Sequence, residues 1–255
     1  MDKVKEALAL AEAAGRILLE SGAEIYRVEE TVLSVCRAMG FGDSQVLAIP
    51  TGVFLTLRNA DGPCGSTVVR VSHRQLNLDR IREANDVARH LSELGPEAAL
   101  ARMEEIRHRE PYPRWLLFLA AGLAAGSFTF IFGGGVPEAL IAALAGWLCH
   151  LALRALGPLP HSPVLENLFG GLVIGLVSLG AVLLVGHGEL EVIIAGAVMP
   201  LLPGLAMTVA IRDTMQGDLV SGVARLADVI LTAACVAVGT GAVLGLWTAI
   251  GGMLP

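Results

Sequence analysis

Residues 164–185 read VLENLFGGLVIGLVSLGAVLLV, and the only charged side chain among them is Glu166, close to the start of the run. A helix needs about 20 mainly apolar residues to cross the hydrocarbon core of a bilayer. The run therefore predicts a transmembrane helix, and it indicates that the chain is a membrane protein.

Four other stretches of the chain have the same apolar composition. The loops between them are short and rich in glycine and proline, and the last stretch is long enough to hold an interfacial or tilted part as well as a span. The expected fold class is an α-helical integral membrane protein with five transmembrane helices, at about residues 115–132, 139–156, 164–185, 192–211 and 219–247.

Charged residues are unevenly distributed along the chain. They make up only 16% of it, against about 25% in a typical soluble domain. Of the 18 lysines and arginines, only Arg154, Arg212 and Arg225 lie after residue 114. The sequence therefore predicts two domains, a soluble one at 1–114 and a transmembrane one at 115–255.

The first domain mixes helical and strand patterns, as in a small α+β domain. Asn77 is a predicted helix N-cap, and residues 59–63 are rich in turn formers between two β-branched runs, a hairpin pattern. Helices are expected at 3–21, 25–39, 77–94 and from 96 onward, and strands at 45–49, 52–58 and 66–71. The N-terminus is charged and lacks the apolar segment of a signal peptide, so we expect this domain in the cytoplasm.

Arginines indicate how the spans are oriented. Arg107, Arg109 and Arg114 precede the first span, which places that side of the membrane in the cytoplasm. Arg154 and Arg212 border the second and fourth loops, whereas the first and third loops hold no base. The alternation predicts a multi-pass protein with its N-terminus in the cytoplasm and its C-terminus outside.

Several function classes lack the residues they need. The net charge is −6 and no basic stripe is interleaved with aromatic residues, so nucleic acid is not an expected partner. The four cysteines are scattered singly, so no metal site, cofactor or disulfide framework is expected. Ser72 and His73 belong to no GxSxG or HExxH motif, and the chain is not expected to be an enzyme.

The first candidate functional feature is the stretch MPLLPG at 199–204. Pro200 and Pro203 each remove a backbone donor inside an apparent span, and Gly204 loosens the helix further. Interrupted helices of this kind mark binding sites of transporters near the middle of the membrane. A proline kink that only shapes the helix bundle is the alternative.

The second feature is a set of charged and polar residues near the last span. Asp218, Ser221, Arg225 and Asp228 fall on one face of a helix, and Arg225 is expected to pair with Asp228 or Ser221. Arg212 and Asp213 precede this face. Such groups either line an aqueous pathway or lie at the interface with Arg225 snorkelling to water. His150 and Arg154 are expected at the interface.

Glycine and alanine are frequent within the spans, which allows helices to pack closely. This composition favours a tight bundle in the lipid bilayer, and it is compatible with a homo-oligomer.

Two combined motifs resemble the threonine/serine exporter family. The first comprises SGAEIYRVEE at 21–30, IPTGVF at 49–54 and Arg70 followed by NLD at 77–79; the second comprises PG at 203–204, IRD at 211–213, GDLVSG at 217–222 and RLA at 225–227. The resemblance covers nearly the whole chain. It implies a cytoplasmic domain followed by five spans in the bacterial cytoplasmic (inner) membrane.

Members of that family carry a further, smaller membrane part in the same chain or in a second protein. Because this chain ends at Pro255, just after the fifth span, the resemblance implies the split form, as in the succinate exporter pair, with a small polytopic membrane partner subunit. It also implies threonine, serine or a dicarboxylate such as succinate as substrate, and export driven by the proton-motive force. The family supplies no established catalytic residues.

The leading hypothesis is a subunit of a secondary exporter of small carboxylate-bearing metabolites. Arg212 and Arg225 attract the carboxylate, and Asp213, Asp218 or Asp228 carries the proton, because burial favours the neutral form of a carboxylate. The broken helix at 200–204 completes this substrate and proton pathway. Two alternatives remain: a membrane-anchored sensor or hydrolase that acts through the cytoplasmic domain, and a scaffold for a partner channel.

Overall fold

The computed structural model describes residues 2–109, 112–156 and 163–251, and the chain forms two compact units. The first unit comprises Met1–Pro111 and Leu205–Ala227, and the second comprises Tyr112–Gly204 and Asp228–Pro255. The first unit therefore takes in a segment from the C-terminal part of the chain, which a linear division at residue 114 does not include. The two domains at 1–114 and 115–255 stay a prediction.

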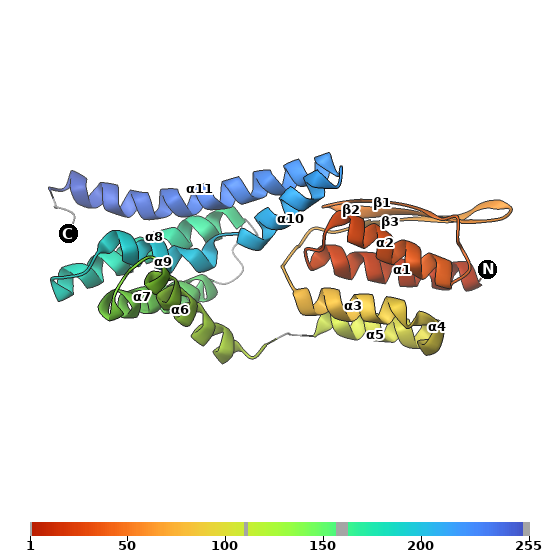
Figure 1. Ribbon diagram of the computed structural model, residues 1–255, viewed down its shortest axis with the longest axis horizontal. Helices are drawn as coiled ribbons and strands as arrows, with labels where there is room; N and C mark the ends of the chain where they lie inside the picture. Colours follow the sequence, from red (N-terminus) through yellow and green to blue (C-terminus); the bar gives the residue numbers. More distant parts are fainter. Residues whose placement is uncertain (1, 110–111, 157–162, 252–255) are drawn as a thin grey trace. The chain divides into compact units, whose positions relative to one another are not determined.

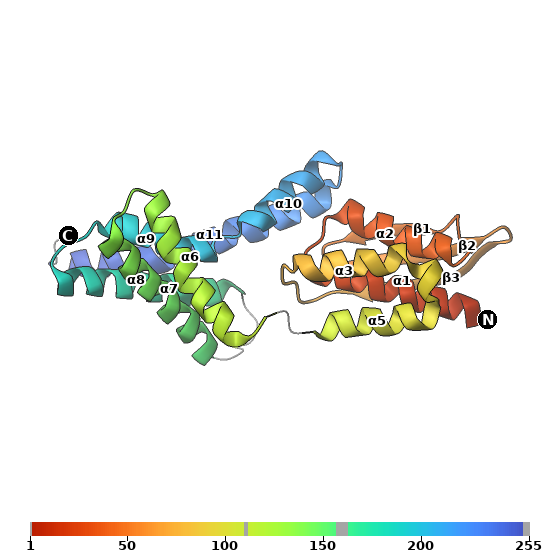
Figure 2. The same ribbon diagram turned by 60° about the horizontal axis from the view of Figure 1, so that its bottom comes forward.

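The N-terminal part of the first unit has three layers (Figure 1). A β-sheet covers one side of the two helices α1 and α2, and α3 and α5 cover the other side. Figure 2 shows α3 and α5 next to each other. The elements are α1 (Asp2–Glu20), α2 (Ile25–Ala38), β1 (Gln45–Ile49), β2 (Gly52–Asn59), β3 (Gly62–Arg70), α3 (Leu78–Arg89), α4 (Leu91–Leu94) and α5 (Pro96–His108).

The core of this unit forms around α1. Leu10, Ile17 and Leu18 are almost fully buried, and so are the small residues Ala7 and Ala14. The small residues let neighbouring elements approach the helix, while the leucine and isoleucine side chains fill the space between layers. Helix α1 is thus a central helix with few exposed positions.

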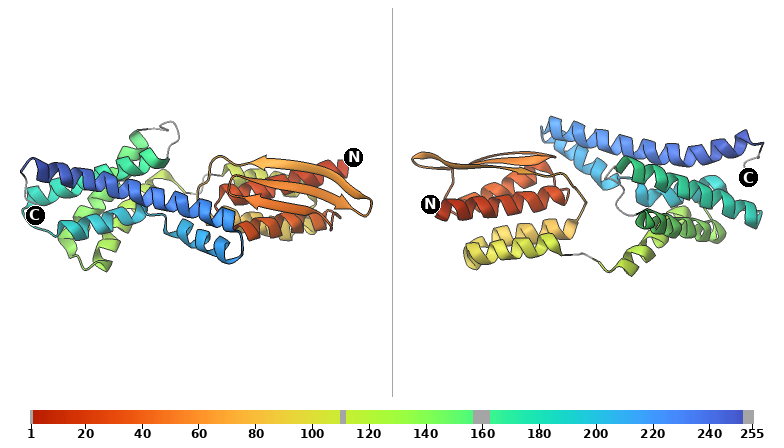
Figure 3. Two further views of the ribbon diagram at one scale, coloured as in Figure 1. Left: turned by 90° about the horizontal axis from the view of Figure 1, so that it is seen from above. Right: turned by 180° about the vertical axis from the view of Figure 1, so that it is seen from behind.

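The sheet is antiparallel with the order β1-β2-β3, seen from above in Figure 3. The predicted hairpin is confirmed, but its loop is shorter than the five residues expected, because β2 ends at Asn59 and β3 begins at Gly62. The register shifts between Leu57 and Arg58, where Pro63 lies opposite Arg58. Proline has no N–H to donate to the neighbouring strand, so an irregularity at this point costs little.

Asn77 caps α3 as predicted, with its side chain accepting a hydrogen bond from the backbone N–H of Arg80 at 2.9 Å. The helix is shorter than the 77–94 segment expected. It ends at Arg89, and a separate short helix follows His90.

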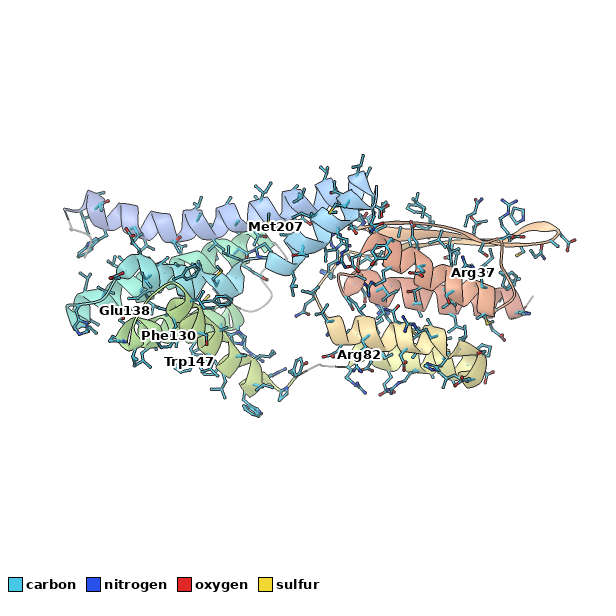
Figure 4. The ribbon with its side chains drawn as sticks, in the orientation of Figure 1. Arg37, Arg82, Phe130, Glu138, Trp147 and Met207 are labelled. Atoms are coloured by element: carbon cyan, nitrogen blue, oxygen red, sulfur yellow. The ribbon has the colours of Figure 1, made fainter. Side chains whose placement is uncertain are left out.

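The second unit consists of apolar helices that pack closely through small residues. A Cβ on Gly146 of α7 (Val136–Ala155) would lie 2.9 Å from the carbonyl oxygen of Ala121 in α6 (Arg114–Ile131). A Cβ on Gly171 of α8 (Pro163–Val185) would lie 2.4 Å from the carbonyl oxygen of Val236 in α11 (Leu219–Ala249). Trp147 of α7, labelled in Figure 4, stacks on Phe118 of α6 with the ring centroids 6.0 Å apart. The elements are α6 (Arg114–Ile131), α7 (Val136–Ala155), α8 (Pro163–Val185), α9 (Leu190–Val198) and the 3-10 helix η1 (Met199–Leu201).

Two helices have residues in both units. They are α10 (Gly204–Met215) and α11 (Leu219–Ala249). Helix α10 begins with Gly204 of the second unit and continues in the first, and α11 begins in the first unit and continues in the second from Asp228 onward.

Within the described residues, four helices are long and apolar enough to cross a membrane. The number rises to five if the broken pair Leu190–Leu201 and Gly204–Met215 is counted as one span. A mostly helical protein with several apolar helices and a small sheet is thus confirmed. The five spans and the cytoplasmic placement of the sheet stay predictions.

Candidate functional site

The apolar helix that begins at Leu190 is interrupted at its two prolines. Helix α9 ends at Val198, η1 covers Met199–Leu201, and α10 begins at Gly204. Pro200 cannot donate to the carbonyl of Gly196, and Pro203 cannot donate to that of Met199, which accepts instead from Leu202 N–H at 3.1 Å. The interruption lies within the stretch MPLLPG.

A buried ion pair follows this break in the sequence, between Asp213 of α10 and Arg225 of α11. Asp213 is 0% exposed and Arg225 is 7% exposed. Oδ2 of Asp213 and Nε of Arg225 are 3.0 Å apart, without an aligned hydrogen bond between these two atoms. Each charge compensates the other, which burial requires because an uncompensated buried ion is costly.

The same two side chains bind the start of α2. Oδ1 of Asp213 accepts a hydrogen bond from the backbone N–H of Ile25 at 3.0 Å, and Nη2 of Arg225 donates to the carbonyl of Ala23 at 2.8 Å. Ile25 is the first residue of α2, and its N-cap, Glu24, provides no side-chain cap. The carboxylate of Asp213 therefore caps α2 from another helix, with its negative charge at the positive end of the helix dipole.

Glu24 adds a second link to the same segment. Its carboxylate forms an ion pair with Arg212 of α10, and another with Arg27 of α2 at 2.7 Å. The Arg212 side chain is half exposed, at 51%, so this pair lies at the surface, unlike the pair of Asp213 and Arg225.

The turn between α10 and α11 fixes the geometry of the pair. The N–H of Asp218 donates to the carbonyl of Asp213 at 2.9 Å, and Gly217 adopts a φ of +95°, which favours glycine. Gly222 lies against α10, because a Cβ there would be 2.0 Å from Oγ1 of Thr214 and 3.0 Å from the carbonyl oxygen of Ala210. The two helices can approach this closely only with glycine at position 222.

The predicted site residues are thus partly brought together. Arg212, Asp213, Ser221 and Arg225 lie on the α10–α11 hairpin, with Ser221 buried, and Asp218 lies at its turn. Arg225, which we expected to pair with Asp228 or Ser221, has Asp213 as a partner that we did not expect. Asp228 is exposed on α11, and Pro200, Pro203 and Gly204 form the break.

Sequence reasoning did not identify Ala23, Glu24 and Ile25 as part of this cluster. Their roles depend on backbone groups and on contacts between segments far apart in the chain, which leave no pattern in the sequence. Within the part of the chain that the structure describes, no group of three or more His, Cys, Asp or Glu side chains has a metal-binding arrangement.

The contacts join the two stretches that first indicated a family. Ala23, Glu24 and Ile25 belong to SGAEIYRVEE, and Arg212, Asp213 and Arg225 belong to the second motif. The family model described as "Putative threonine/serine exporter" matches residues 9–247. The chain belongs to the threonine/serine exporter family. This is a family of transporters and not of enzymes.

Proteins similar to this chain have two kinds of name. A "Probable succinate transporter subunit YjjP" of Klebsiella aerogenes is 28% identical, with 87% of each chain covered, and one of Escherichia coli is 26% identical, with 91% of each chain covered. A "Probable threonine/serine exporter" of Mycobacterium tuberculosis is 26% identical over 88% of this chain. The chain spans only 43% of the length of that last protein. No solved structure matches the chain.

Proposed function

We propose that the chain is a subunit of a secondary exporter of small carboxylate-bearing metabolites, driven by the proton-motive force. The family match and the names of the relatives support export, and they support threonine, serine and succinate as the substrates to test. The observation that carries the proposed mechanism is the buried pair of Asp213 and Arg225 at the start of α2.

A substrate carboxylate is chemically equivalent to the side chain of Asp213. It therefore competes with Asp213 for Arg225, and it competes with Glu24 for the more exposed Arg212. Guanidinium groups bind carboxylates through two parallel hydrogen bonds, so a free carboxylate is a good replacement for either partner. In this proposal Arg212 attracts the substrate and Arg225 then exchanges Asp213 for it.

That exchange also explains how a proton is coupled to transport. An aspartate that loses its arginine partner in a buried position favours its neutral form and takes up a proton. Asp213 is the first candidate for the proton carrier, because it is fully buried, and Asp218 and Asp228 are the others. Protonation of Asp213 weakens its hold on Ile25 and so releases the hairpin from α2.

The broken helix supports the same mechanism. Pro200, Pro203 and Gly204 precede the hairpin, and interrupted helices in transporters line binding sites and allow neighbouring parts to move. We place the protein in the bacterial inner membrane, with the N-terminus in the cytoplasm and the C-terminus outside. The word "subunit" in two relatives' names supports a transporter of more than one component. We propose a small polytopic membrane protein as the partner.

The experiment is efflux of labelled threonine, serine and succinate from cells that lack their own exporters. The cells express the chain alone or with the small membrane protein of the family from the same genome. Arg225→Ala abolishes efflux, Arg225→Lys reduces it because a lysine lacks the planar fork, and Arg37→Ala, an exposed site on α2 (Figure 4), leaves it unchanged. Export by Arg225→Ala at the parent's rate and expression level refutes the role of Arg225.

A sensor function is the second candidate, and one groove favours it. The groove measures about 290 Å³ and lies between α2 and α3, lined by Arg27, Thr31, Asn85 and Arg89 among others. The hydroxyl of Thr31 donates to Oδ1 of Asn85 at 2.7 Å at its wall. Binding of a metabolite that Arg89→Ala abolishes, in a chain that exports nothing, would favour the sensor.

A further inference from the structure

A cavity of about 140 Å³ lies among the helices of the second unit. Its walls come from α6, α7, α8, α9 and η1, and they include Ala121, Cys149, His150, Ile174 and Pro200. Figures 1 and 2 show α6, α7, α8 and α9 grouped together in this unit. The cavity is therefore lined by helices that are expected to cross the membrane, and it is open on one side, where Pro200 is exposed.

The cavity extends from the middle of α6 and α8 to the last two turns of α7 (Val136–Ala155), which hold Cys149 and His150. Ala121 is close to the middle of α6 (Arg114–Ile131), and Ile174 is close to the middle of α8 (Pro163–Val185). Pro200 lies in η1, where the helix that begins at Leu190 is interrupted. Secondary transporters bind their substrates beside such interruptions.

His150 supplies the polar group of the cavity. Its Nε2 atom is buried and has no hydrogen-bond partner among the described residues. The ring packs edge-on against Phe118 of α6, with centroids 6.3 Å apart, which holds its orientation. A buried polar atom without a partner is unfavourable, so this nitrogen indicates a ligand or a water in the cavity.

The remainder of the described lining is uncharged. Cys149 is buried and its thiol faces the carbonyl of Gly170 at 3.7 Å, and no Asp, Glu, Lys or Arg side chain is among the lining residues. An apolar wall with one polar group is typical of small-molecule sites. Such a wall binds weakly, which a transporter needs, because the substrate must also leave.

The volume indicates the size of a ligand that the cavity can take up. A protein cavity of about 150 Å³ is known to hold a benzene molecule, so this one holds a single compact molecule of similar size. Serine, threonine and succinate are small enough to fit in it.

We propose that this cavity is the substrate site within the membrane, that Nε2–H of His150 donates a hydrogen bond to an oxygen of the bound metabolite, and that the metabolite's charged groups lie toward the open side of the cavity, because its uncharged wall cannot compensate them. The inference rests on the proposed function for its substrate class and adds a residue that the hairpin of α10 and α11 does not contain. The alternative interpretation is that the cavity holds only water.

The test uses the complete chain, with its partner, in membranes. The thiol of Cys149 is a reporter in the cavity wall, so labelling by methyl methanethiosulfonate is followed on the peptide that contains it by mass spectrometry. Serine, threonine and succinate are added in turn. The exported compound is expected to slow labelling of Cys149 at least threefold in the parent and not in His150→Leu.

Export is measured in the same membranes. His150→Leu raises the KM for export tenfold or more, and His150→Gln, which keeps an N–H donor on a shorter planar side chain, raises it less. His187→Leu, in the exposed turn after α8, is the control and leaves KM unchanged. Labelling of the parent does not depend on how well any variant folds.

The outcomes separate the two proposals. Export with a parent-like KM in His150→Leu, and no protection of Cys149, overturns the cavity as substrate site but leaves the exporter standing. Protection of Cys149 that depends on His150, without export of any compound, supports the site and overturns the exporter. If there is no export and no protection of Cys149, both proposals are overturned, and water is the occupant of the cavity.

Discussion

The backbone N–H of Ile25 donates to the carboxylate of Asp213 at 3.0 Å, across 188 positions of the sequence. This bond caps α2 with a side chain from α10, because Glu24 at the N-cap position forms no cap of its own. Asp213 also faces Arg225, so one carboxylate connects the N-terminal helices to the α10–α11 hairpin. The predictions below test what this connection contributes.

Asp213→Asn separates the charge of Asp213 from its role as a cap. The amide oxygen still accepts from Ile25, but Arg225 keeps a buried charge without its partner carboxylate. We expect the free energy of unfolding to fall by about 3–5 kcal/mol. The measurement is thermal unfolding of the purified chain in detergent.

The control for this variant is Asp61→Asn in the exposed turn between β2 and β3, which should leave the unfolding midpoint unchanged. Arg225→Met added to Asp213→Asn should restore part of the lost stability, because the unpaired charge is then absent. A midpoint for Asp213→Asn equal to that of the parent would show that the pair does not stabilise the fold.

Arg212→Ala should have a much smaller effect on stability. The Arg212 side chain is 51% exposed, and exposed ion pairs contribute about 0–1 kcal/mol. Because Arg212 is the proposed first contact of the substrate, we expect export to fall while the unfolding midpoint shifts little. A loss of stability as large as that of Asp213→Asn would contradict the distinction between the surface pair and the buried pair.

Gly222→Ala should destabilise the hairpin. The new Cβ would lie 2.0 Å from Oγ1 of Thr214, and overpacking of this kind costs about 1–3 kcal/mol. Thr214→Ala in the same chain should recover part of the loss, because the carbonyl of Ala210 remains 3.0 Å away. Gly42→Ala, where nothing lies within 4 Å, is the control, and equal midpoints for the two glycine variants would contradict the close approach.

Glu29 should make stability depend on pH. Burial raises the pKa of its carboxyl, the charge of Asp218 raises it further, and the hydrogen bond from the N–H of Ala48 at 2.7 Å opposes the shift. Because the pKa of Glu29 is raised in the folded state, the contribution of Glu29 to the stability of the fold is complete below the ordinary pKa of a glutamate. The stabilisation is lost as the pH rises through the folded pKa.

Glu29→Gln should therefore be more stable than the parent at neutral pH and equal to it at low pH. Unfolding midpoints measured between pH 4 and pH 8 test this, with the exposed neighbour Glu30→Gln as control. Parallel pH profiles for the parent and Glu29→Gln would contradict the assignment.

Local patterns in the sequence predicted most of the elements. The helix cap at Asn77, the hairpin of β2 and β3 and the apolar helices follow from residues that are neighbours in the chain. The ends of elements were less accurate where packing decides them, as at His90, where one predicted helix becomes two.

The candidate site was only partly predictable for the same reason. The arginines and aspartates were noticeable because charges are rare in apolar segments, but their partners are not neighbours in sequence. Arg225 meets Asp213 on the preceding helix and Ala23 in the N-terminal part, contacts that depend on tertiary folding. The expected place of His150 at the interface stays a prediction, whereas the cavity beside its buried Nε2 atom was not predictable, because five separate elements form it.

The most direct test of the exporter is transport by the purified chain and its small partner in sealed lipid vesicles. Labelled threonine, serine and succinate are supplied one at a time, with and without an imposed proton gradient. The account predicts that one of them crosses the membrane only when both chains are present, faster with the gradient, and not at all with Arg225→Ala. The account would be contradicted if the transport rate depended neither on the proton gradient nor on Arg225, or if no transport occurred with both chains inserted.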